Sequence, residues 1–466
     1  MRTKYIDLVE QTFDFPQNEF QLSNDTLTFH GINLMELIEK YGTPLKFNYL
    51  PQISANIQKC NHWFKNSMND IGYEGKYYYS YCTKSNHFSF VLEEVLKNNV
   101  HIETSSAVDI NIVQNLFKKG KIKKGTYIIC NGYKPESYID KIAELINQDE
   151  LQVIPIIDNT EELDSILNKT TRKINIGIRI ASEEEPQFTF YTSRLGIRYR
   201  EILPFYHEKI KDNPNVELSM LHFFVNTGIN DNSYYWNELT KCLNIYTDLK
   251  KINENLNSLN LGGGFPIKTS LGFKFDYEYI ITEILQQIKK VCIENKINDP
   301  DIFTEFGSFT VGESGGALFK TLHQKQQNDR EKWNMIDSSF MTNLPDTWSI
   351  NKRFILLPIN KWNCHYERVL LGGLTCDSDD YYNSEQHSNA IYLPNHSQKN
   401  PLFIGFFNTG AYQESIGGYG GLTHCLIPEP KHIIIERDKN GKIISKVFNE
   451  EQTANNFLNI LGYNNE

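Results

Sequence analysis

The chain has 466 residues, 40% of them hydrophobic, which is sufficient for a large buried core and two domains. Asp and Glu number 57 against 47 Lys and Arg, and the formal net charge of -10 argues against a nucleic acid or an anionic membrane as partner. No apolar run approaches the roughly 20 residues that cross a bilayer, and the start, MRTKYIDLVEQTF, does not resemble a signal peptide.

The first forty residues contain LTFHG in a hairpin-like context, which predicts a strand that joins a later β domain. From residue 77 to 306, strand-like runs alternate with amphipathic stretches such as SFVLEEVLKNN and YIDKIAELINQ. This alternation predicts parallel strands, and eight repeats predict a closed (β/α)8 barrel. The predicted strands are YYYSYC, HIETSS, TYIIC, QVIPII, INIGIRI, LSMLHF, SLNLGG and DIFTEF.

After residue 307 the helical pattern gives way to short strands separated by polar turns. This pattern predicts a second, mostly antiparallel β domain. Three parts are expected: an N-terminal segment of the β domain (1–40), a barrel (41–306) and a C-terminal β domain (307–466). The predicted strands of the last part are WNMIDSS, RFILLPI, ERVLLGGLTC, AIYLP, PLFIGFF and KHIIIERD.

Polar residues follow the predicted barrel strands, at the end where (β/α)8 barrels carry their chemistry. One strand end alone is usually a cap or a turn, whereas a whole set indicates a common ligand. The set comprises Lys84, Glu103, Ser105, Asn131, Asp158, Arg179 and Glu305.

Three glycines, Gly262, Gly263 and Gly264, follow the seventh strand in LNLGGGFP. Backbone N–H groups can close on a phosphate there, and Thr227 can add a hydroxyl. A phosphate site, a strand-end lysine and a strand-end carboxylate together indicate pyridoxal phosphate, with Lys84 as the Schiff-base lysine. Glu305 would keep the pyridine nitrogen protonated.

Five motifs then resemble those of the barrel-type pyridoxal-phosphate decarboxylases that act on ornithine, arginine and diaminopimelate. The motifs YCTKSN, LNLGGGFP, TEFGS, LTCDSDD and TGAYQE occur in the family's order between residues 40 and 430. The segments LPDTWSINKRFILLPI and AYQES are most similar to biosynthetic arginine decarboxylases.

The resemblance implies roles for residues beyond the barrel and an isologous homodimer that shares its active sites. Cys376 would reprotonate the substrate carbon in the neighbouring subunit's site, and Asp377 would bind the distal cation of the substrate. Within the cofactor site, Glu103 would orient Lys84. The remaining cofactor contacts would come from Thr227, Gly262, Gly263, Gly264 and Tyr412.

Two positions depart from the family pattern. Phe224 stands where a histidine usually stacks on the cofactor ring, and it offers stacking without a proton or a hydrogen bond. His222 lies two residues earlier on the same strand face. Ser308 replaces a cation that is expected near the phosphate.

Eight cysteines stand singly without a Cys-x-x-Cys pair, so a reducing cytoplasm is expected. The twelve histidines do not cluster at ligand spacings, and no metal site is expected. The acidic residues beside Cys376 would raise the pKa of its thiol, which suits a proton donor.

The expected activity is decarboxylation of L-arginine to agmatine and CO2 for polyamine synthesis. Alternatives are decarboxylation of ornithine, diaminopimelate or carboxynorspermidine. A non-catalytic regulatory binding protein with the same fold is a further alternative, to which the Phe224 and Ser308 departures lend weight.

Overall fold

The computed structural model describes residues 15, 17–182, 193–329, 331–382 and 391–463. The chain divides into two compact units. The barrel unit comprises Ile53–Pro266 and Phe275–Thr310, and the sheet unit comprises Met1–Gln52, Ile267–Lys274 and Val311–Glu466. Residues 41–52, which the sequence pattern assigned to the barrel, thus belong to the sheet unit.

The barrel unit is built on a closed barrel of parallel strands in the order β5-β6-β7-β8-β9-β10-β11-β12, within the part of the chain that is described. All eight coincide with the predicted strands, which confirms the (β/α)8 barrel. The strands are β5 (Tyr77–Cys82), β6 (His101–Thr104), β7 (Tyr127–Cys130), β8 (Gln152–Ile157), β9 (Ile174–Arg179), β10 (Val216–His222), β11 (Ser258–Asn260) and β12 (Asp301–Phe306).

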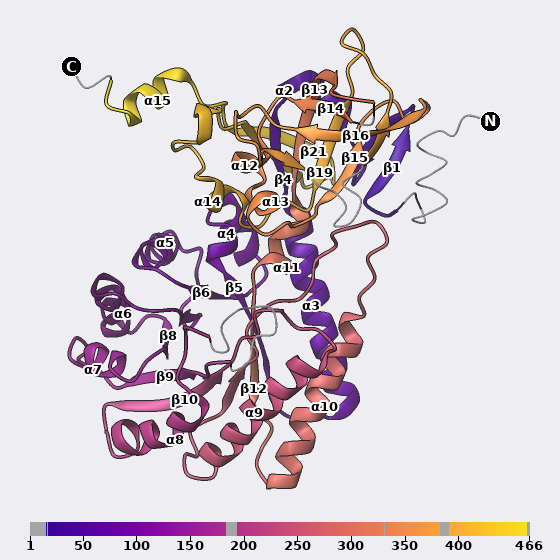
Figure 1. Ribbon diagram of the computed structural model, residues 1–466. Coiled ribbons are helices and arrows are strands. Elements are labelled where there is room, and N and C mark those ends of the chain that lie inside the picture. The colour runs from indigo at the N-terminus through magenta and orange to yellow at the C-terminus, as the bar shows by residue number, and fades with distance from the viewer. Residues whose placement is uncertain (1–14, 16, 183–192, 330, 383–390, 464–466) are drawn as a thin grey trace. The chain divides into compact units, whose positions relative to one another are not determined.

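Helices surround the barrel strands, as Figure 1 shows for α5, α6 and α7. Several helices begin at a polar cap: Ser106, Asn232 and Asp276 accept hydrogen bonds from the first-turn N–H groups of α5, α9 and α10. The helices are α3 (Leu50–Ile71), α4 (Ser89–Leu96), α5 (Ala107–Lys118), α6 (Glu136–Gln148), α7 (Glu162–Leu167), α8 (Ile202–Phe205), α9 (Ser233–Lys250), α10 (Tyr277–Asn295) and α11 (Ser308–Val311).

Apolar side chains fill the barrel interior and leave its carboxyl end for polar groups. Ile129, Ile154, Ile156, Met220 and Phe303 form one buried cluster inside the strands. The polar residues that follow the strands therefore stand on a close-packed layer that holds their backbones in place.

The sheet unit contains, among the described residues, a three-stranded sheet and a ten-stranded sheet. Most pairs are antiparallel, as predicted, but β14 with β16 and β4 with β20 are parallel. Its strands are β1 (Phe20–Ser23), β2 (Thr26–Phe29), β3 (Ile32–Asn33), β4 (Leu45–Tyr49), β13 (Gly315–Gln326), β14 (Lys332–Ile336), β15 (Ile355–Pro358), β16 (Tyr366–Gly372), β17 (Tyr381–Tyr382), β18 (Ile391–Pro394), β19 (Phe403–Phe407), β20 (Lys431–Arg437) and β21 (Ile443–Asn449).

Aromatic side chains from distant parts of the sequence form the core of the sheet unit. Phe29 stacks on Phe407 with ring centroids 5.4 Å apart, and Phe15 stacks on Trp362 at 5.2 Å. The predicted strand around LTFHG is β2, and its Leu27 N–H donates to the carbonyl oxygen of Ile359. The helices of this unit are α2 (Leu34–Tyr41), α12 (Phe340–Asn343), α13 (Pro345–Ser349), α14 (Gln413–Gly417) and α15 (Ala454–Ile460).

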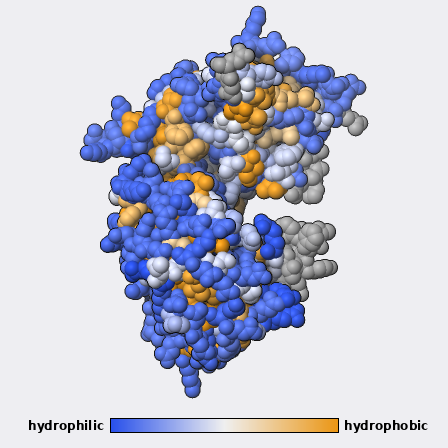
Figure 2. Space-filling model, turned by 90° about the vertical axis from the view of Figure 1, so that its left-hand side faces the viewer, coloured by the Kyte–Doolittle hydropathy of each residue, from blue (hydrophilic) through white to orange (hydrophobic). Residues whose placement is uncertain are grey.

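Hydrophilic residues cover most of the face shown in Figure 2, with hydrophobic residues in smaller groups between them. Among the described residues, no helix combines the length and the apolar character needed to cross a membrane.

Candidate active site

Lys84 lies on a short 3-10 turn, Thr83–Ser85, directly after strand β5. Thr83 Oγ1 donates to the carbonyl oxygen of Glu103 at 3.1 Å, which ties the turn to the neighbouring strand. A Cβ on Gly307 would stand 1.8 Å from Ser85 Oγ, so the turn requires a glycine opposite it. The turn is therefore held on two sides while the Lys84 side chain stays 46% exposed.

Glu103 on β6 is fully buried, and its Oε1 lies 3.7 Å from Lys84 Nζ. Burial raises the pKa of this carboxyl, and the Lys84 charge acts in the opposite direction. The pair gives Lys84 one fixed electrostatic partner at the barrel end.

Glu305 near the end of β12 is the most extensively hydrogen-bonded carboxylate of the site. Asn131 Nδ2 donates to its Oε2 at 2.8 Å, and Asn260 Nδ2 donates to its Oε1 at 2.7 Å. Burial raises the pKa of Glu305, while Lys84 and the two amides oppose that shift. The two amides fix the plane of the carboxylate, which leaves it aimed in one direction.

His222 at the end of β10 lies beside Glu305, with Nε2 3.9 Å from Oε2. Burial, followed by the Arg179 charge, lowers the pKa of His222 to about 3, so the ring is neutral at neutral pH. Arg179 stands with Cζ 5.7 Å from the centroid of the Phe224 ring. The half-buried Phe224 therefore has a cation on its face and follows directly on the buried Phe223.

The three glycines after β11 make a turn that no other residue type would fit. Gly262 has φ +67°, and a Cβ there would stand 2.7 Å from the carbonyl oxygen of Phe223. A Cβ on Gly263 would stand 2.1 Å from the carbonyl oxygen of Glu305, and Gly264 has φ +106°. The turn thus packs backbone against backbone between the loop after β10 and strand β12.

Polar atoms without a hydrogen-bond partner gather at this end of the barrel. Within the described residues they include Thr227 Oγ1, Ser85 Oγ and Asn131 Oδ1, and each is buried. A buried polar atom without a partner costs free energy, so a ligand that supplies the missing hydrogen bonds is stabilised there. Ser308, the predicted neighbour of the phosphate, begins α11 and is half-buried.

Two of the polar strand ends serve local structure. The N–H and the hydroxyl of Ser105 both donate to Asp109, at 2.9 and 3.3 Å. Asp158 Oδ1 accepts from the N–H of Gly196 at 2.8 Å. These contacts are those of caps and turns, so Ser105 and Asp158 are left out of the candidate site. The barrel brings the following side chains together at one end: Lys84, Glu103, Asn131, Arg179, His222, Asn260 and Glu305.

Cys376, Asp377 and Tyr412 belong to the sheet unit. Cys376 is exposed, and the hydrogen bond with Cys425 is the largest cause that raises the pKa of its thiol. The charge of the neighbouring Asp377 raises the pKa of Cys376 less than Cys425 does. The sequence pattern had predicted that the acidic residues would be the cause. Asp377 Oδ2 lies 3.8 Å from His424 Nε2. Tyr412 precedes α14 with φ +69°.

Sequence reasoning missed three residues. Asn260 lies within the glycine motif, and its signal was an amide in an otherwise apolar strand. Cys425 and His424 are adjacent in the sequence but lie far along the chain from Cys376. The three residues therefore do not form a short sequence motif of the kind that predicts a metal site.

Comparison with known proteins gives consistent matches. The family model described as "Pyridoxal-dependent decarboxylase, pyridoxal binding domain" matches residues 54–312. A protein named biosynthetic arginine decarboxylase from Prochlorococcus marinus is 23% identical over 89% of this chain and 82% of its own. Arginine decarboxylase 1 of Arabidopsis thaliana is 20% identical over 86% of this chain and 72% of its own.

Two solved structures share the fold. The biosynthetic arginine decarboxylase of Campylobacter jejuni has a TM-score of 0.80 at 19% identity, covering 99% of this chain and 91% of its own. A diaminopimelate decarboxylase from M. jannaschi has a TM-score of 0.77 at 19% identity, covering 95% of this chain and 97% of its own.

The barrel-end residues fit pyridoxal phosphate on their own chemistry. The buried Glu305 carboxylate, fixed by two amides, suits a protonated ring nitrogen. The glycine turn lacks the Cβ atoms that would close it, and the Thr227 hydroxyl is without a partner among the described residues. Both features suit a phosphate.

Proposed function

The chain belongs to the family of pyridoxal-dependent decarboxylases, and on that premise we propose that it converts L-arginine to agmatine and CO2. The observation that carries the proposal is the group of Lys84, Glu103 and Glu305 at one end of the barrel. The substrate is supported by the names of the relatives, which match most of the chain at low identity.

The cofactor is pyridoxal phosphate. When bound, it accepts the electron pair that CO2 leaves behind. Lys84 would hold its aldehyde carbon, with Glu103 orienting the amine. Thr227 and the turn Gly262–Gly264 would hold the phosphate, joined by Ser308 and Tyr412.

Glu305 would keep a proton on the ring nitrogen. Burial raises the pKa of Glu305, because a buried carboxylate loses its hydration. A positive charge held against the carboxylate, such as a protonated ring nitrogen, offsets the free-energy cost of ionising it. Asn131 and Asn260 would keep both oxygens pointed at the same place, and Phe224 would pack on the ring face where its half-exposed side chain stands. The neutral His222 would add no positive charge next to the ring.

Cys376 would deliver the proton that replaces CO2 on the substrate carbon. A thiol with a raised pKa is protonated at neutral pH and therefore has a proton to give. Asp377 would bind the guanidinium, whose planar donors pair with the two oxygens of a carboxylate. Its partial exposure leaves it accessible to a substrate.

The decisive experiment is a substrate panel with the cofactor-loaded enzyme. CO2 release and the amine product would be measured for L-arginine, L-ornithine, L-lysine, meso-diaminopimelate and carboxynorspermidine. Arginine should give the highest kcat/KM, with agmatine as product. If another amino acid of the panel gave the highest kcat/KM, that amino acid would replace arginine as the proposed substrate. A yellow protein that decarboxylates none of them would favour the alternative of a regulatory binding protein.

The active sites would be shared across an isologous homodimer, with Cys376 serving the partner subunit's Lys84. Lys84→Ala and Cys376→Ala homodimers should each be nearly inactive. Mixing equal amounts makes half of the dimers mixed, each with one intact site, so activity should recover to roughly a quarter of wild type. No recovery, after subunit exchange is verified by mass spectrometry, would place Cys376 in its own subunit's site or outside catalysis.

Polyamine synthesis in a reducing cytoplasm is the setting proposed for this reaction. Its support is the word biosynthetic in the relatives' names and the single, free cysteines of the described residues. Deleting the gene in its host should lower agmatine, and added agmatine should restore growth if no other route supplies it. Unchanged agmatine would contradict this setting.

A further inference from the structure

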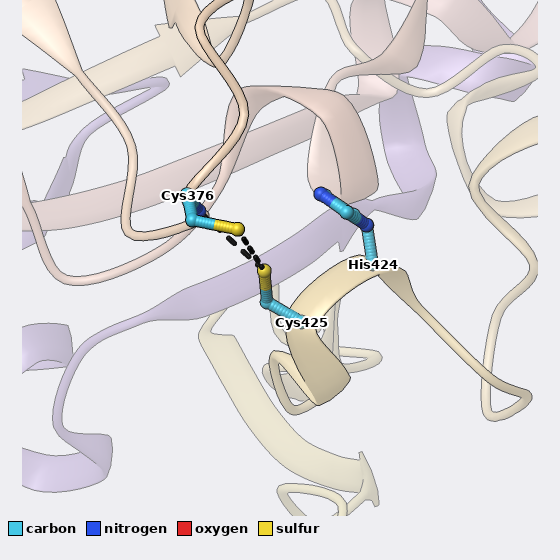
Figure 3. Close-up of side chains that lie close together, drawn as sticks. All are labelled: Cys376, His424 and Cys425. Atoms are coloured by element: carbon cyan, nitrogen blue, oxygen red, sulfur yellow. Dashed lines mark hydrogen bonds between the residues drawn. The ribbon is translucent and has the colours of Figure 1, made fainter.

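Three side chains of the sheet unit form a cluster that the decarboxylation chemistry does not use as a whole. This thiol–imidazole cluster consists of Cys376, His424 and Cys425, and one ligand atom of each lies within 4.8 Å of the others. Figure 3 shows the two thiols pointing at each other, with Sγ atoms 3.4 Å apart and the imidazole beside them. The cysteines are 49 positions apart in sequence, so the fold brings them together.

The spacing suits a tetrahedral metal ion. Zn²⁺–S bonds of about 2.3 Å at tetrahedral angles put two thiolate ligands about 3.8 Å apart, and the observed pair needs only a small adjustment to reach that. All three residues are exposed, so an ion can reach them. Asp377 Oδ2 stands 3.8 Å from His424 Nε2, where a carboxylate commonly supports a metal-binding imidazole.

Cys425 reaches Cys376 from an unusual backbone position. Its φ is +53°, as is that of Leu426, and the left-handed region is unfavourable for residues other than glycine. Cys425 Sγ also accepts from the N–H of Cys376 at 3.4 Å. The second thiol therefore contacts the first from a backbone conformation that is uncommon at two successive residues.

We propose that Cys376, Cys425 and His424 bind a thiophilic divalent cation such as Zn²⁺, with water in the fourth position. Binding replaces the two thiol protons, which pass to solvent, by two metal–sulfur bonds. Resting on the proposed role of Cys376 as proton donor, the consequence is that the bound ion blocks decarboxylation reversibly.

The binding step is tested with Co²⁺ as a spectroscopic probe. Cofactor-loaded enzyme, freed of metal by a chelator and kept anaerobic with a non-thiol reductant, should take up one Co²⁺ per chain. Thiolate-to-cobalt charge-transfer bands and tetrahedral d–d bands should appear, and Zn²⁺ should remove them. Difference spectra against metal-free enzyme separate these bands from cofactor absorption.

Cys425→Ser should abolish the charge-transfer bands that depend on two thiolates. Cys364→Ser is the matched control, because Cys364 is a half-buried free cysteine of the same unit outside the cluster, and it should keep them. Absence of thiolate bands in the wild type, or their survival in Cys425→Ser, would overturn the site.

The activity step uses the same variants. Zn²⁺ should cause complete loss of wild-type decarboxylation that a chelator reverses. Measured against its own metal-free activity, Cys425→Ser should resist Zn²⁺ by more than the roughly 10–100-fold that loss of a supporting residue costs a metal site. A loss of activity that only a reductant reverses would indicate a Cys376–Cys425 disulfide and would overturn the proposal of a metal site. If no substrate is decarboxylated, the cobalt spectra still decide binding, so the two proposals fail separately.

Discussion

The two regions that carry the proposed chemistry are held in opposite ways. At the barrel end, Glu103 and Glu305 are buried, and two amides fix Glu305 by hydrogen bonds of 2.8 and 2.7 Å. In the sheet unit, Cys376 and Asp377 are exposed on a loop. Cys376 Sγ lies 3.4 Å from Cys425 Sγ, and Asp377 Oδ1 accepts from the N–H of Asp379, two positions along the same loop, at 2.9 Å. The carboxylates of the first region are buried and bonded to side chains from other strands, whereas the second region is exposed to solvent and its contacts are local or to another surface loop.

This difference matches two separate tasks. A buried carboxylate acts strongly on a neighbouring charge, because little water screens the interaction. An exposed thiol and carboxylate can meet a substrate that must enter and leave, but solvent weakens what each contributes. Substitution of the buried carboxylate Glu305 should therefore cost more activity than substitution of the exposed carboxylate Asp377.

Lys84→Ala should have the largest effect of any single substitution. Loss of the amine removes the only covalent attachment proposed for the cofactor, so activity should fall to background. Borohydride treatment of the wild type should fix cofactor to a peptide containing Lys84, as mass spectrometry would show. Lys118→Ala, an exposed lysine on α5, is the control. Label on another lysine would contradict the assignment.

Glu305→Gln should follow, because it keeps the shape and removes the charge. A reduction of kcat on the order of 10²–10³-fold is expected, comparable with removal of one preorganised electrostatic group from an active site. Steady-state kinetics at saturating cofactor would measure it. Glu136→Gln, an exposed glutamate on α6, should be unchanged. Equal kcat at full cofactor occupancy would remove Glu305 from the mechanism.

Asp377→Asn should weaken arginine use by about 1.5–3 kcal/mol in kcat/KM, the range for hydrogen bonds to charged groups. Preference among basic substrates should relax at the same time, because the lost charge selects for a distal cation. Asp379→Asn is the matched control, an exposed aspartate two positions along the same loop. Unchanged arginine kinetics would mean that Asp377 only faces solvent.

Substitution of His222 should have the smallest effect, and this effect is on the pH dependence of stability. Its folded-state pKa of about 3 lies below the unfolded value of 6.5, so folding favours the neutral ring. The stabilisation is fully present above about pH 6.5 and is lost as the pH falls toward 3. His222→Gln should therefore reduce the slope of unfolding free energy between pH 6 and 5 by up to about 1.4 kcal/mol per pH unit.

Urea denaturation at several pH values would measure that slope. His432 in the sheet unit is the counterpart, because burial also lowers its pKa to about 3. His432→Gln should change the slope similarly, so on this measure the two regions should be alike. A slope that neither substitution changes would show that the pKa of each ring is the same in the folded and the unfolded state, and would contradict the lowering of both pKa values by burial.

The barrel could be predicted because its signals are local. Each strand is a short apolar run bounded by turn residues, and the parallel order then puts Lys84 and Glu305 at the same end. Their roles remain predictions, but their proximity to Glu103 and to the two amides is an observed feature of the fold.

What the sequence did not reveal depends on contacts between distant residues. Asn260 binds a carboxylate 45 positions away, and the contact exists only because β11 and β12 pair in one register. Cys425 meets Cys376 across 49 positions through an exposed loop without periodicity. Residue type predicts what a side chain can do, whereas its partners follow from strand register and loop path.

Gly263 shows how such packing limits change in the molecule. Because a Cβ there would stand 2.1 Å from the carbonyl oxygen of Glu305, every other amino acid displaces the strand that carries the carboxylate. The constraint concerns backbone space and not phosphate affinity. An evolutionary or laboratory search for a different cofactor or substrate can therefore alter the loops around the barrel end only where no such close contact exists, and at this position it must keep the glycine or rebuild β12 together with it.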